Sequence, residues 1–189
     1  MGRAASTEVG VWPDHVAEAW TVEALETLPD NSLRYEILDG TLIVSPAPTP
    51  LHQRVVVRMV LLLTAACPDD HEVFVAPLVW QPDRRTSLEP DLLVVRKVRI
   101  GPRSITQTPL VTEVTSPGTA RIDRMIKFSR YAEGGISQYW IVDPAVPSVE
   151  VYDLTDDGYA LVASGTADDV VVVSRPLNLT VIPQGLVGE

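Results

Sequence analysis

The sequence predicts an α/β domain with one mixed central β-sheet and helices on its faces. Three observations support this class: an Asp-Gly hairpin signal, one long helical segment, and short apolar runs on both sides of a second helix. Strands that alternate with helices in this order are typical of an α/β fold. At 189 residues with 46% apolar content, the chain is long enough for a single core. We therefore expect one domain over 1–189, with a β-rich C-terminal extension at about 149–189.

The first elements are a helical segment and a hairpin. Apolar residues recur at helical spacing from Trp12 to Leu28, with Thr21 as a candidate cap inside the segment. Asp39-Gly40 then separates two apolar, β-prone runs, 34–38 and 41–44. Asp-Gly is a strong hairpin signal because both turn positions need positive φ.

A long helix is predicted next, over Leu51 to Ala66. Val55 to Val57 would favour a strand by propensity, but the apolar stretch is about twice a normal strand length. We therefore expect a helix that is buried on most of its circumference and ends at Cys67-Pro68. The proline-rich stretch 45–50 before it predicts a loop.

The remaining elements are extended segments around a second helix. The helix is expected over about Thr119 to Glu133, with Ser116 or Thr119 as its cap and Gly134-Gly135 as its stop. The expected strands before it and after it are 72–80, 90–95, 110–115, 138–142, 149–154, 159–163 and 170–174.

Charge is distributed unevenly along the chain. The net charge is −10, yet the segment 84–130 holds ten of the fifteen Lys and Arg residues and has a net charge of +6. A local basic field suits a polyanionic ligand, although ordinary solvated surface explains charge alone equally well. With one cysteine and no long apolar run or apolar leader, we expect a soluble cytoplasmic protein without disulfides or membrane contact.

Two carboxylates stand at the ends of predicted strands beside apolar residues. Asp91 follows Pro90 at the start of one strand, and Glu113 lies near the end of the next. Such a carboxylate costs desolvation energy unless a cation or hydrogen-bond donors compensate it. Because consecutive strands are usually neighbours, the pair could share Mg²⁺ or Mn²⁺, with Glu36 as a third ligand. Backbone donors and arginine partners are the alternative compensation.

The second predicted helix carries a polar stripe that could supply a cation. Asp123, Lys127 and Tyr131 follow at i, i+4 and i+8, and the stripe is flanked by Arg121, Arg124 and Arg130. The spacing alone favours an ordinary Asp–Lys surface pair.

His52, at the start of the long helix, fits three roles. It could act as a base, contact a phosphate, or hydrogen bond at the helix start. A lone histidine is more often structural, and neither a phosphate-binding Gly-rich loop nor a serine nucleophile motif accompanies it.

Seven short motifs occur in one order along the chain. They are Tyr35-Glu36-Ile37-Leu38-Asp39-Gly40, His52-Gln53, Pro90-Asp91, Glu113-Val114-Thr115-Ser116-Pro117, Asp123-Arg124 with Lys127, Tyr131, and Gln138-Tyr139-Trp140-Ile141-Val142-Asp143-Pro144. This order closely resembles the Uma family of restriction-endonuclease-like proteins, within the PD-(D/E)xK nuclease superfamily. The resemblance runs from about Thr21 to Asp153.

The resemblance implies a restriction-endonuclease-like core, with a mixed central β-sheet flanked by helices, and Mg²⁺- or Mn²⁺-dependent hydrolysis of phosphodiester bonds in DNA. Asp91 matches the Asp of the PD motif, Glu113 the second acid, and Glu36 the acid from the first hairpin region. Thr115 stands where the motif has lysine, and Lys127 matches a lysine that has moved to the helix. These four charged residues are the expected catalytic group, with the three acids as metal ligands.

The resemblance also suggests the substrate contacts and the assembly. The expected contacts to the nucleic-acid backbone are Arg121, Arg124, Arg130 and His52. A homodimer is expected because cutting two strands needs two sites. Gln138 replaces an acid of the family, so it is not expected to bind metal.

Two alternative functions remain open on the sequence. One is a catalytically inactive nucleic-acid-binding or assembly module that retains the fold, since fold does not fix function. The other is a metal-dependent hydrolase of RNA or another phosphodiester, because the same metal chemistry serves both substrates.

Overall fold

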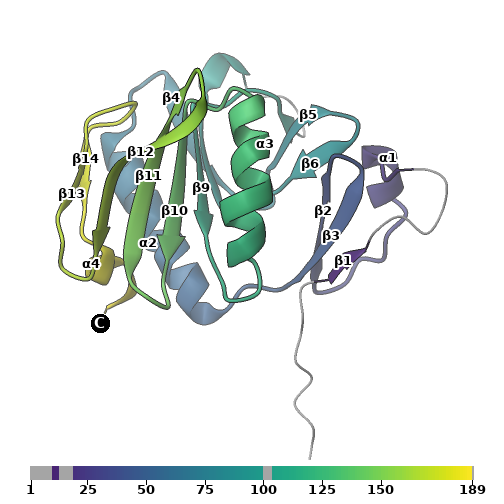
Figure 1. Ribbon diagram of the computed structural model, residues 1–189, viewed down its shortest axis with the longest axis horizontal. Helices are drawn as coiled ribbons and strands as arrows, with labels where there is room; N and C mark the ends of the chain where they lie inside the picture. The colour runs from purple at the N-terminus through teal and green to yellow at the C-terminus, as the bar shows by residue number, and fades with distance from the viewer. Residues whose placement is uncertain (1–9, 13–18, 100–103, 189) are drawn as a thin grey trace, which may run out of the picture.

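The strands form two six-stranded sheets and one two-stranded sheet, with helices packed against them (Figure 1). The computed structural model describes residues 10–12, 19–99 and 104–188. The predicted α/β class with a mixed central sheet and flanking helices is confirmed. The hairpin region, however, belongs to a second sheet instead of the central one.

The central sheet is mixed, because only β9 and β10 run parallel while its other neighbouring strands are antiparallel. Its strands, in spatial order, are β12 (Gly158–Thr166), β11 (Ser148–Thr155), β10 (Gln138–Asp143), β9 (Leu110–Val114), β7 (Leu92–Arg96) and β4 (His71–Val75).

The second sheet contains the predicted hairpin. Its strands, in spatial order, are β1 (Gly10–Trp12), β3 (Thr41–Pro46), β2 (Leu33–Leu38), β6 (Thr86–Leu88), β5 (Val79–Asp83) and β8 (Ser104–Ile105). Asp39 and Gly40 have φ values of 49° and 85°, so the hairpin prediction and its physical reason are confirmed.

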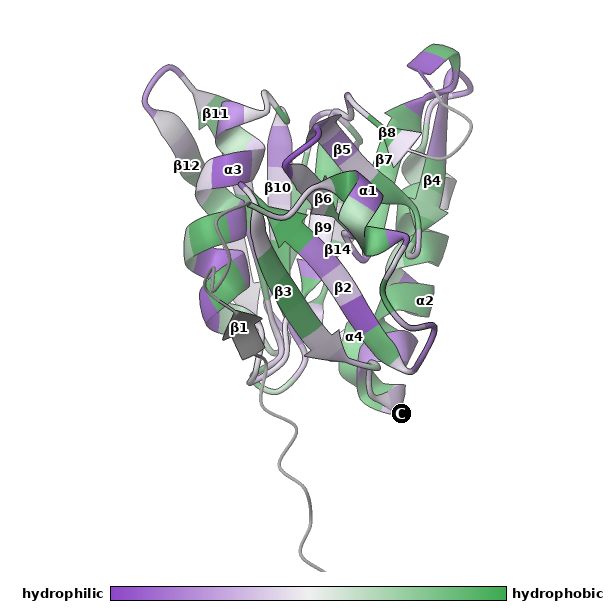
Figure 2. Ribbon diagram, turned by 90° about the vertical axis from the view of Figure 1, so that its right-hand side faces the viewer, coloured by the Kyte–Doolittle hydropathy of each residue, from purple (hydrophilic) through white to green (hydrophobic). Residues whose placement is uncertain are grey.

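Helices cover both faces of the central sheet. The helical elements are α1 (Val22–Leu25), α2 (Pro50–Ala66), a short 3-10 turn η1 (Lys97–Arg99), the π-helical segment η2 (Ile122–Lys127), α3 (Phe128–Glu133) and α4 (Pro183–Val187). Helix α2 and helix α3 lie on opposite sides of the sheet (Figure 2). Val55, Met59 and Leu63 of α2 share one apolar core with Trp140, whereas Tyr131 of α3 shares the other with Trp80.

Helix α2 has the predicted span, but its burial differs from the prediction. Thr49 caps it by accepting a hydrogen bond of 3.2 Å from the backbone N–H of His52, and the helix ends before Cys67. Its burial is one-sided, because Val57 and Leu61 are 56% and 66% exposed. The prediction that most of its circumference is buried is therefore wrong; the apolar outward residues made the segment look more buried than it is.

The N-terminal helix prediction holds for the short helix after Thr21 and is wrong at Trp12. Trp12 ends strand β1, which pairs with β3 from Gly10↔Val44 onwards, and the helix spans only Val22–Leu25. Thr21 precedes that helix without a side-chain capping bond. The predicted helical residues at 13–18 lie outside the described part of the chain. Pairing at a sheet edge depends on a distant strand, so local periodicity could not reveal it.

The predicted strand 72–80 is two strands in different sheets. The chain turns at Ala76-Pro77, and β4 and β5 continue in the central and second sheet respectively. A proline has no N–H for a β-ladder, which explains the break. Four short strands in the described residues escaped prediction because each has only two or three residues: β1, β6, β8 and β14 (Leu179–Val181).

The second predicted helix connects the parallel strands β9 and β10. Ser116 and Thr119 cap its start reciprocally, each backbone N–H donating to the other hydroxyl at 3.3 Å or less. At its other end Gly135 has a φ of 74°, as the stop signal predicted. This connection carries the polar stripe over the end of β9.

Strands β11 and β12 extend the central sheet, and only β13 (Val171–Val173) and β14 (Leu179–Val181) form a separate pair. Of the four, β11 and β12 are thus continuous with the central sheet. In the described residues, no helix is long and apolar enough to span a membrane.

The end of α3 yields a stability prediction. A Cβ atom added at Gly134 would lie 2.2 Å from Cζ2 of Trp80, a fully buried ring. Because overpacking a core forces its neighbours to shift, we expect Gly134→Ala to lower the free energy of unfolding by about 1–3 kcal/mol in a urea titration. Gly185→Ala is the matched control, since its nearest neighbour atom is 4.0 Å away. Equal stability of the two variants would contradict this packing.

Candidate active site

The pairing of β7 with β9 brings the two predicted strand-end acids to one edge of the sheet. The antiparallel register pairs Leu92 with Thr112, so the chain places Asp91 beside Glu113. The backbone N–H of Val114 donates to Oδ2 of Asp91 at 2.8 Å. The sequence prediction that these carboxylates converge is therefore consistent with the register, and both side chains are buried.

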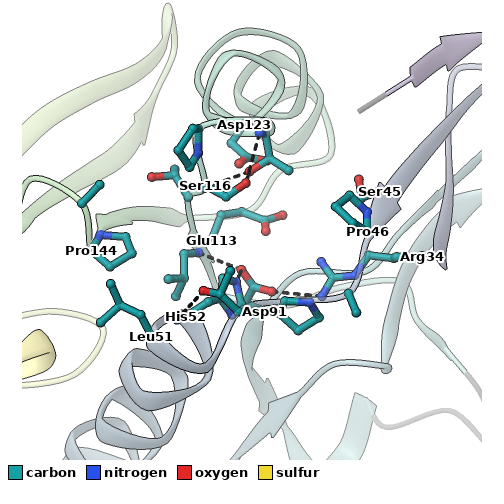
Figure 3. A pocket seen from close by; sticks show the side chains of 18 of the residues that line it. Arg34, Ser45, Pro46, Leu51, His52, Asp91, Glu113, Ser116, Asp123 and Pro144 are labelled. Carbon is teal, nitrogen blue, oxygen red and sulfur yellow. Dashed lines mark hydrogen bonds and ion pairs between the residues drawn. The ribbon is translucent and has the colours of Figure 1, made fainter. Parts of the chain in front are cut away.

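A cavity of about 180 Å³ opens at this edge (Figure 3). Its walls include proline-bearing loops at Ser45–Thr49, Ser116-Pro117 and Pro144-Ala145. The charged and titratable side chains that line it are Arg34, Glu36, His52, Asp91, Glu113, Asp123 and Lys127. Five of the eight predicted site residues thus meet around one cavity.

Lys127 is the centre of the cluster. Its ammonium lies 2.9 Å from Glu36 Oε1, 3.0 Å from Glu113 Oε1 and 3.7 Å from Asp123 Oδ1. Burial alone would lower the pKa of Lys127, but the three carboxylates raise it above its ordinary value, so the side chain stays charged. The ordinary helix pair with Asp123 exists, yet it is the longest of the three contacts.

Glu113 is held by two donors on the same oxygen. Besides Lys127, the hydroxyl of Tyr131 donates to its Oε1 at 2.8 Å. Burial raises the pKa of Glu113 well above its usual value, although Lys127 opposes the shift. Burial also raises the pKa of Tyr131, which therefore remains a neutral hydrogen-bond donor. The other oxygen of Glu113 accepts no hydrogen bond from the described residues and faces the cavity.

Asp91 has the opposite electrostatic setting. It accepts from Arg34 at 3.2 Å and lies 3.1 Å from Nε2 of His52, in addition to its bond from the Val114 amide. Burial would raise the pKa of Asp91, but these three partners lower it below its usual value. The surroundings therefore favour the charged form of Asp91, whereas burial disfavours the charged form of Glu113.

Glu36 connects the hairpin to the helix. Its Oε1 accepts from the Lys127 ammonium and, at 2.8 Å, from the backbone N–H of Glu89. A carboxylate from β2 thus helps to hold a lysine from η2 beside an acid from β9.

The donor chemistry of the cavity suits a hard divalent cation. Four buried carboxylates face two basic side chains and His52, so negative charge is in excess even if the histidine is counted as charged. Within the described residues no three His, Cys, Asp or Glu side chains lie together at metal-binding spacing. Mg²⁺ usually binds one or two carboxylates and completes its shell with water and phosphate, so Asp91 and Glu113 fit that requirement.

The three predicted phosphate-contact arginines lie outside the cavity lining. Arg124 pairs with Glu150, and Arg130 lies 3.0 Å from Asp39 and 2.5 Å from Asp83. Arg121 is exposed on the helix surface. His52, in contrast, is in the lining and has two contacts: its backbone caps the helix and its ring bonds Asp91.

Two residues of the cluster were missed by the sequence reasoning. Arg34 contacts Asp91, and Glu89 contacts Arg34 through its side chain at 3.0 Å. A signal for Arg34 was present, because it precedes Glu36 by two residues on one strand and so shares its face. Glu89 could not be found in this way, since its contacts depend on how β2 and β6 pair.

Thr115 stands at the position where the nuclease motif has lysine, and it lines the cavity. It is 2% exposed, and its backbone N–H donates to the carbonyl of Val142 at 2.8 Å. The ammonium that the motif would supply from position 115 is instead beside Glu113 from position 127.

A mixed sheet flanked by helices, with acids at adjacent strand ends and a lysine beside one of them, defines a nuclease-like α/β class. The family model of Uma2, described as "Putative restriction endonuclease", matches residues 22–183, and the chain belongs to this family. The family resemblance in the sequence is thereby confirmed.

A solved structure has the same fold. It is the 1.96 Å crystal structure of a "putative nuclease belonging to DUF820" from Anabaena variabilis ATCC 29413. The TM-score is 0.70 at 18% identity, and the match covers 88% of this chain and 97% of the other. No curated protein matches the chain.

The buried lysine yields a second stability prediction. Lys127→Met would leave three carboxylates without their shared cation, so we expect the free energy of unfolding to fall by about 3–5 kcal/mol. Lys97→Met, at an exposed lysine, should change it by no more than about 0.5 kcal/mol. Chemical denaturation measures both. A loss below about 1 kcal/mol for Lys127→Met would contradict the cluster, because breaking a buried charge pair costs more than that.

Asp123 predicts a pH dependence of stability. Burial raises its pKa from 3.8 to about 6. A raised carboxyl pKa stabilises the folded state below the unfolded pKa, and this contribution is lost as the pH rises through the folded pKa. Between about pH 4 and pH 7, wild type should therefore lose about 3 kcal/mol relative to Asp123→Asn, measured in chelator. Asp156→Asn, at an exposed turn, should follow wild type. If the free energy of unfolding changed with pH in parallel for all three proteins, the raised pKa of Asp123 would be contradicted.

Proposed function

We propose that the protein is a divalent-metal-dependent endonuclease that hydrolyses phosphodiester bonds, with DNA as its substrate. The observation that carries this proposal is the 3.0 Å contact between the Lys127 ammonium and Glu113. It supplies an acid–lysine pair at a strand end in a chain that has Thr115 in the usual lysine position. The Uma2 family and the nuclease-like fold support the same function.

In this proposal Asp91 and Glu113 hold Mg²⁺ or Mn²⁺, and Glu36 assists as a third carboxylate. A bound divalent ion would lower the pKa of a water molecule and neutralise charge on the scissile phosphate. Asp91 is prepared for this role by the partners that keep it ionised. A bound cation would offset the burial that disfavours the charge on Glu113.

The residues of the chain have distinct tasks in the proposed reaction. Lys127 holds Glu113 and, as a charged donor at the cavity, orients the attacking water or stabilises the negative charge that develops on the phosphate. Tyr131 keeps Glu113 in one orientation through its hydrogen bond, so that the free oxygen points to the cavity. His52 holds Asp91 and, as a lining residue of the cavity, would contact a phosphate.

The basic helix surface is proposed to position the nucleic-acid backbone. Arg121 is exposed, whereas Arg124 and Arg130 would first have to leave their present carboxylate partners. Phosphate contacts of this kind position a strand without reading its sequence. We therefore expect weak sequence preference from these three residues.

A second candidate function is a non-catalytic module that binds or assembles on nucleic acid. The observation that favours it is Thr115 at the motif lysine position.

We propose a homodimer for the enzyme, since cleavage of both strands of a duplex needs two sites. Sedimentation equilibrium, which measures mass in solution, would reveal a monomer if this assembly is wrong.

The test of the proposed function is cleavage by Glu113→Gln. Labelled single- and double-stranded DNA and RNA are incubated with wild type and variant in Mg²⁺ or Mn²⁺. We expect wild type to cleave DNA and the variant to lose at least about 100-fold in rate, because the ligand charge is removed. Glu133→Gln, at an exposed acid of helix α3, should retain wild-type activity.

Calorimetric titration with Mn²⁺ separates the candidates. Wild type should bind the ion, and Asp91→Asn and Glu113→Gln should bind it much more weakly. Absence of Mn²⁺ binding by wild type would favour the non-catalytic module, because a degenerate site should not bind the ion. Cleavage by Glu113→Gln at the wild-type rate would refute the proposed site, and cleavage of RNA alone would change the substrate.

A further inference from the structure

Arg34 lies at the cavity with no role in the mechanism above. It comes from β2 and lines the cavity with a side chain that is 19% exposed, whereas that of Lys127 is 4% exposed. Among the described residues of the lining, these two are the only Lys or Arg side chains. Arg34 is thus the more accessible cation of the pair.

Glu89 contacts the guanidinium of Arg34 with both its side chain and its backbone. Arg34 Nε lies 3.0 Å from Glu89 Oε1, and Arg34 Nη1 donates to the backbone carbonyl of Glu89 at 3.3 Å. The same glutamate donates its own N–H to Glu36. Two contacts to one neighbour hold the planar group in a single orientation, so little conformational entropy is lost when it binds a ligand.

The guanidinium retains donors for a ligand. Its third contact is from Nη2 to Asp91 Oδ1 at 3.2 Å. A guanidinium carries five N–H groups, so three contacts leave two of them without a partner in the described residues. The Lys127 ammonium, in contrast, donates two of its three N–H groups to Glu36 and Glu113 and lies 3.7 Å from Asp123, so it has at most one donor left.

A phosphodiester that enters this cavity adds negative charge beside four buried carboxylates. It therefore needs donors that are charged, accessible and not yet fully used. Burial alone would lower the pKa of Arg34, but Asp91, Glu36 and Glu89 raise it, so the group remains a cation. Its planar fork matches the tetrahedral oxygens of a phosphate better than a point charge does.

We propose that Arg34 binds the phosphate group of the substrate in the cavity and that Glu89 is its positioning residue. This inference rests on the proposed phosphodiester hydrolysis. A metal ion bound to Asp91 would weaken the hydrogen bond between Asp91 and Arg34. The Nη2 donor of Arg34 would then also be available to the phosphate. Arg34 therefore acts on substrate affinity more than on metal affinity.

The test uses small probes that depend on neither DNA nor RNA. Bis(p-nitrophenyl) phosphate serves as a phosphodiester substrate, and inorganic phosphate serves as the anion for binding in the presence of Mn²⁺. Arg34→Met should weaken phosphate binding and raise KM by about tenfold or more, because a charge-assisted hydrogen bond is lost. Mn²⁺ affinity, measured by calorimetry, should change by less than about threefold.

Three further variants refine the comparison. Arg34→Lys keeps the charge but loses the fork, so it should recover part of the phosphate affinity. Glu89→Gln should weaken phosphate binding less than Arg34→Met does, because the donor is still present. Arg84→Met is the control, since Arg84 pairs with Glu23 at the surface and lies outside the cavity lining.

The outcomes distinguish this inference from the proposed function. If Arg34→Met leaves phosphate binding unchanged, the inference is wrong whatever the enzyme does. If it weakens Mn²⁺ binding and spares phosphate affinity, Arg34 only orients Asp91. If wild type binds phosphate through Arg34 but hydrolyses no phosphodiester, the inference stands and the proposed function fails.

Discussion

One buried ammonium determines the arrangement of the site. Lys127 brings together Glu36 of the hairpin, Glu113 of the central sheet and Asp123 of its own helix. A buried charge pair is tolerated only when geometry and hydrogen bonds compensate desolvation. The position of η2 and α3 over the end of β9 is thus constrained electrostatically, while Tyr131 and Trp80 constrain it by packing.

The two strand-end carboxylates are adjacent but electrostatically different. Arg34, His52 and a backbone amide stabilise the charge on Asp91, whereas burial destabilises the charge on Glu113. We propose that this difference between the two acids favours the binding of a cation. The local arrangement, more than the overall charge of −10, therefore decides which ligands the protein can take.

Features that depend on local chemistry could be predicted from the sequence. The Asp39-Gly40 hairpin and the long helix after Thr49 follow from turn geometry and segment length. The acids at 91 and 113 were identifiable because a carboxylate beside apolar residues needs a partner. The division into two sheets and the contacts of Glu89 could not be predicted, since both depend on which distant strands pair. The ion pairs that occupy Arg124 and Arg130 are non-local in the same way.

We propose that Asp91 and Glu113 share a divalent metal ion while Lys127 stays beside Glu113. A crystal of the protein soaked in Mn²⁺, with anomalous scattering recorded, tests it most directly. We expect an anomalous peak between the two carboxylates, with the ammonium of Lys127 still in contact with Glu113. A fully occupied peak elsewhere, or no peak at a saturating Mn²⁺ concentration, would contradict it.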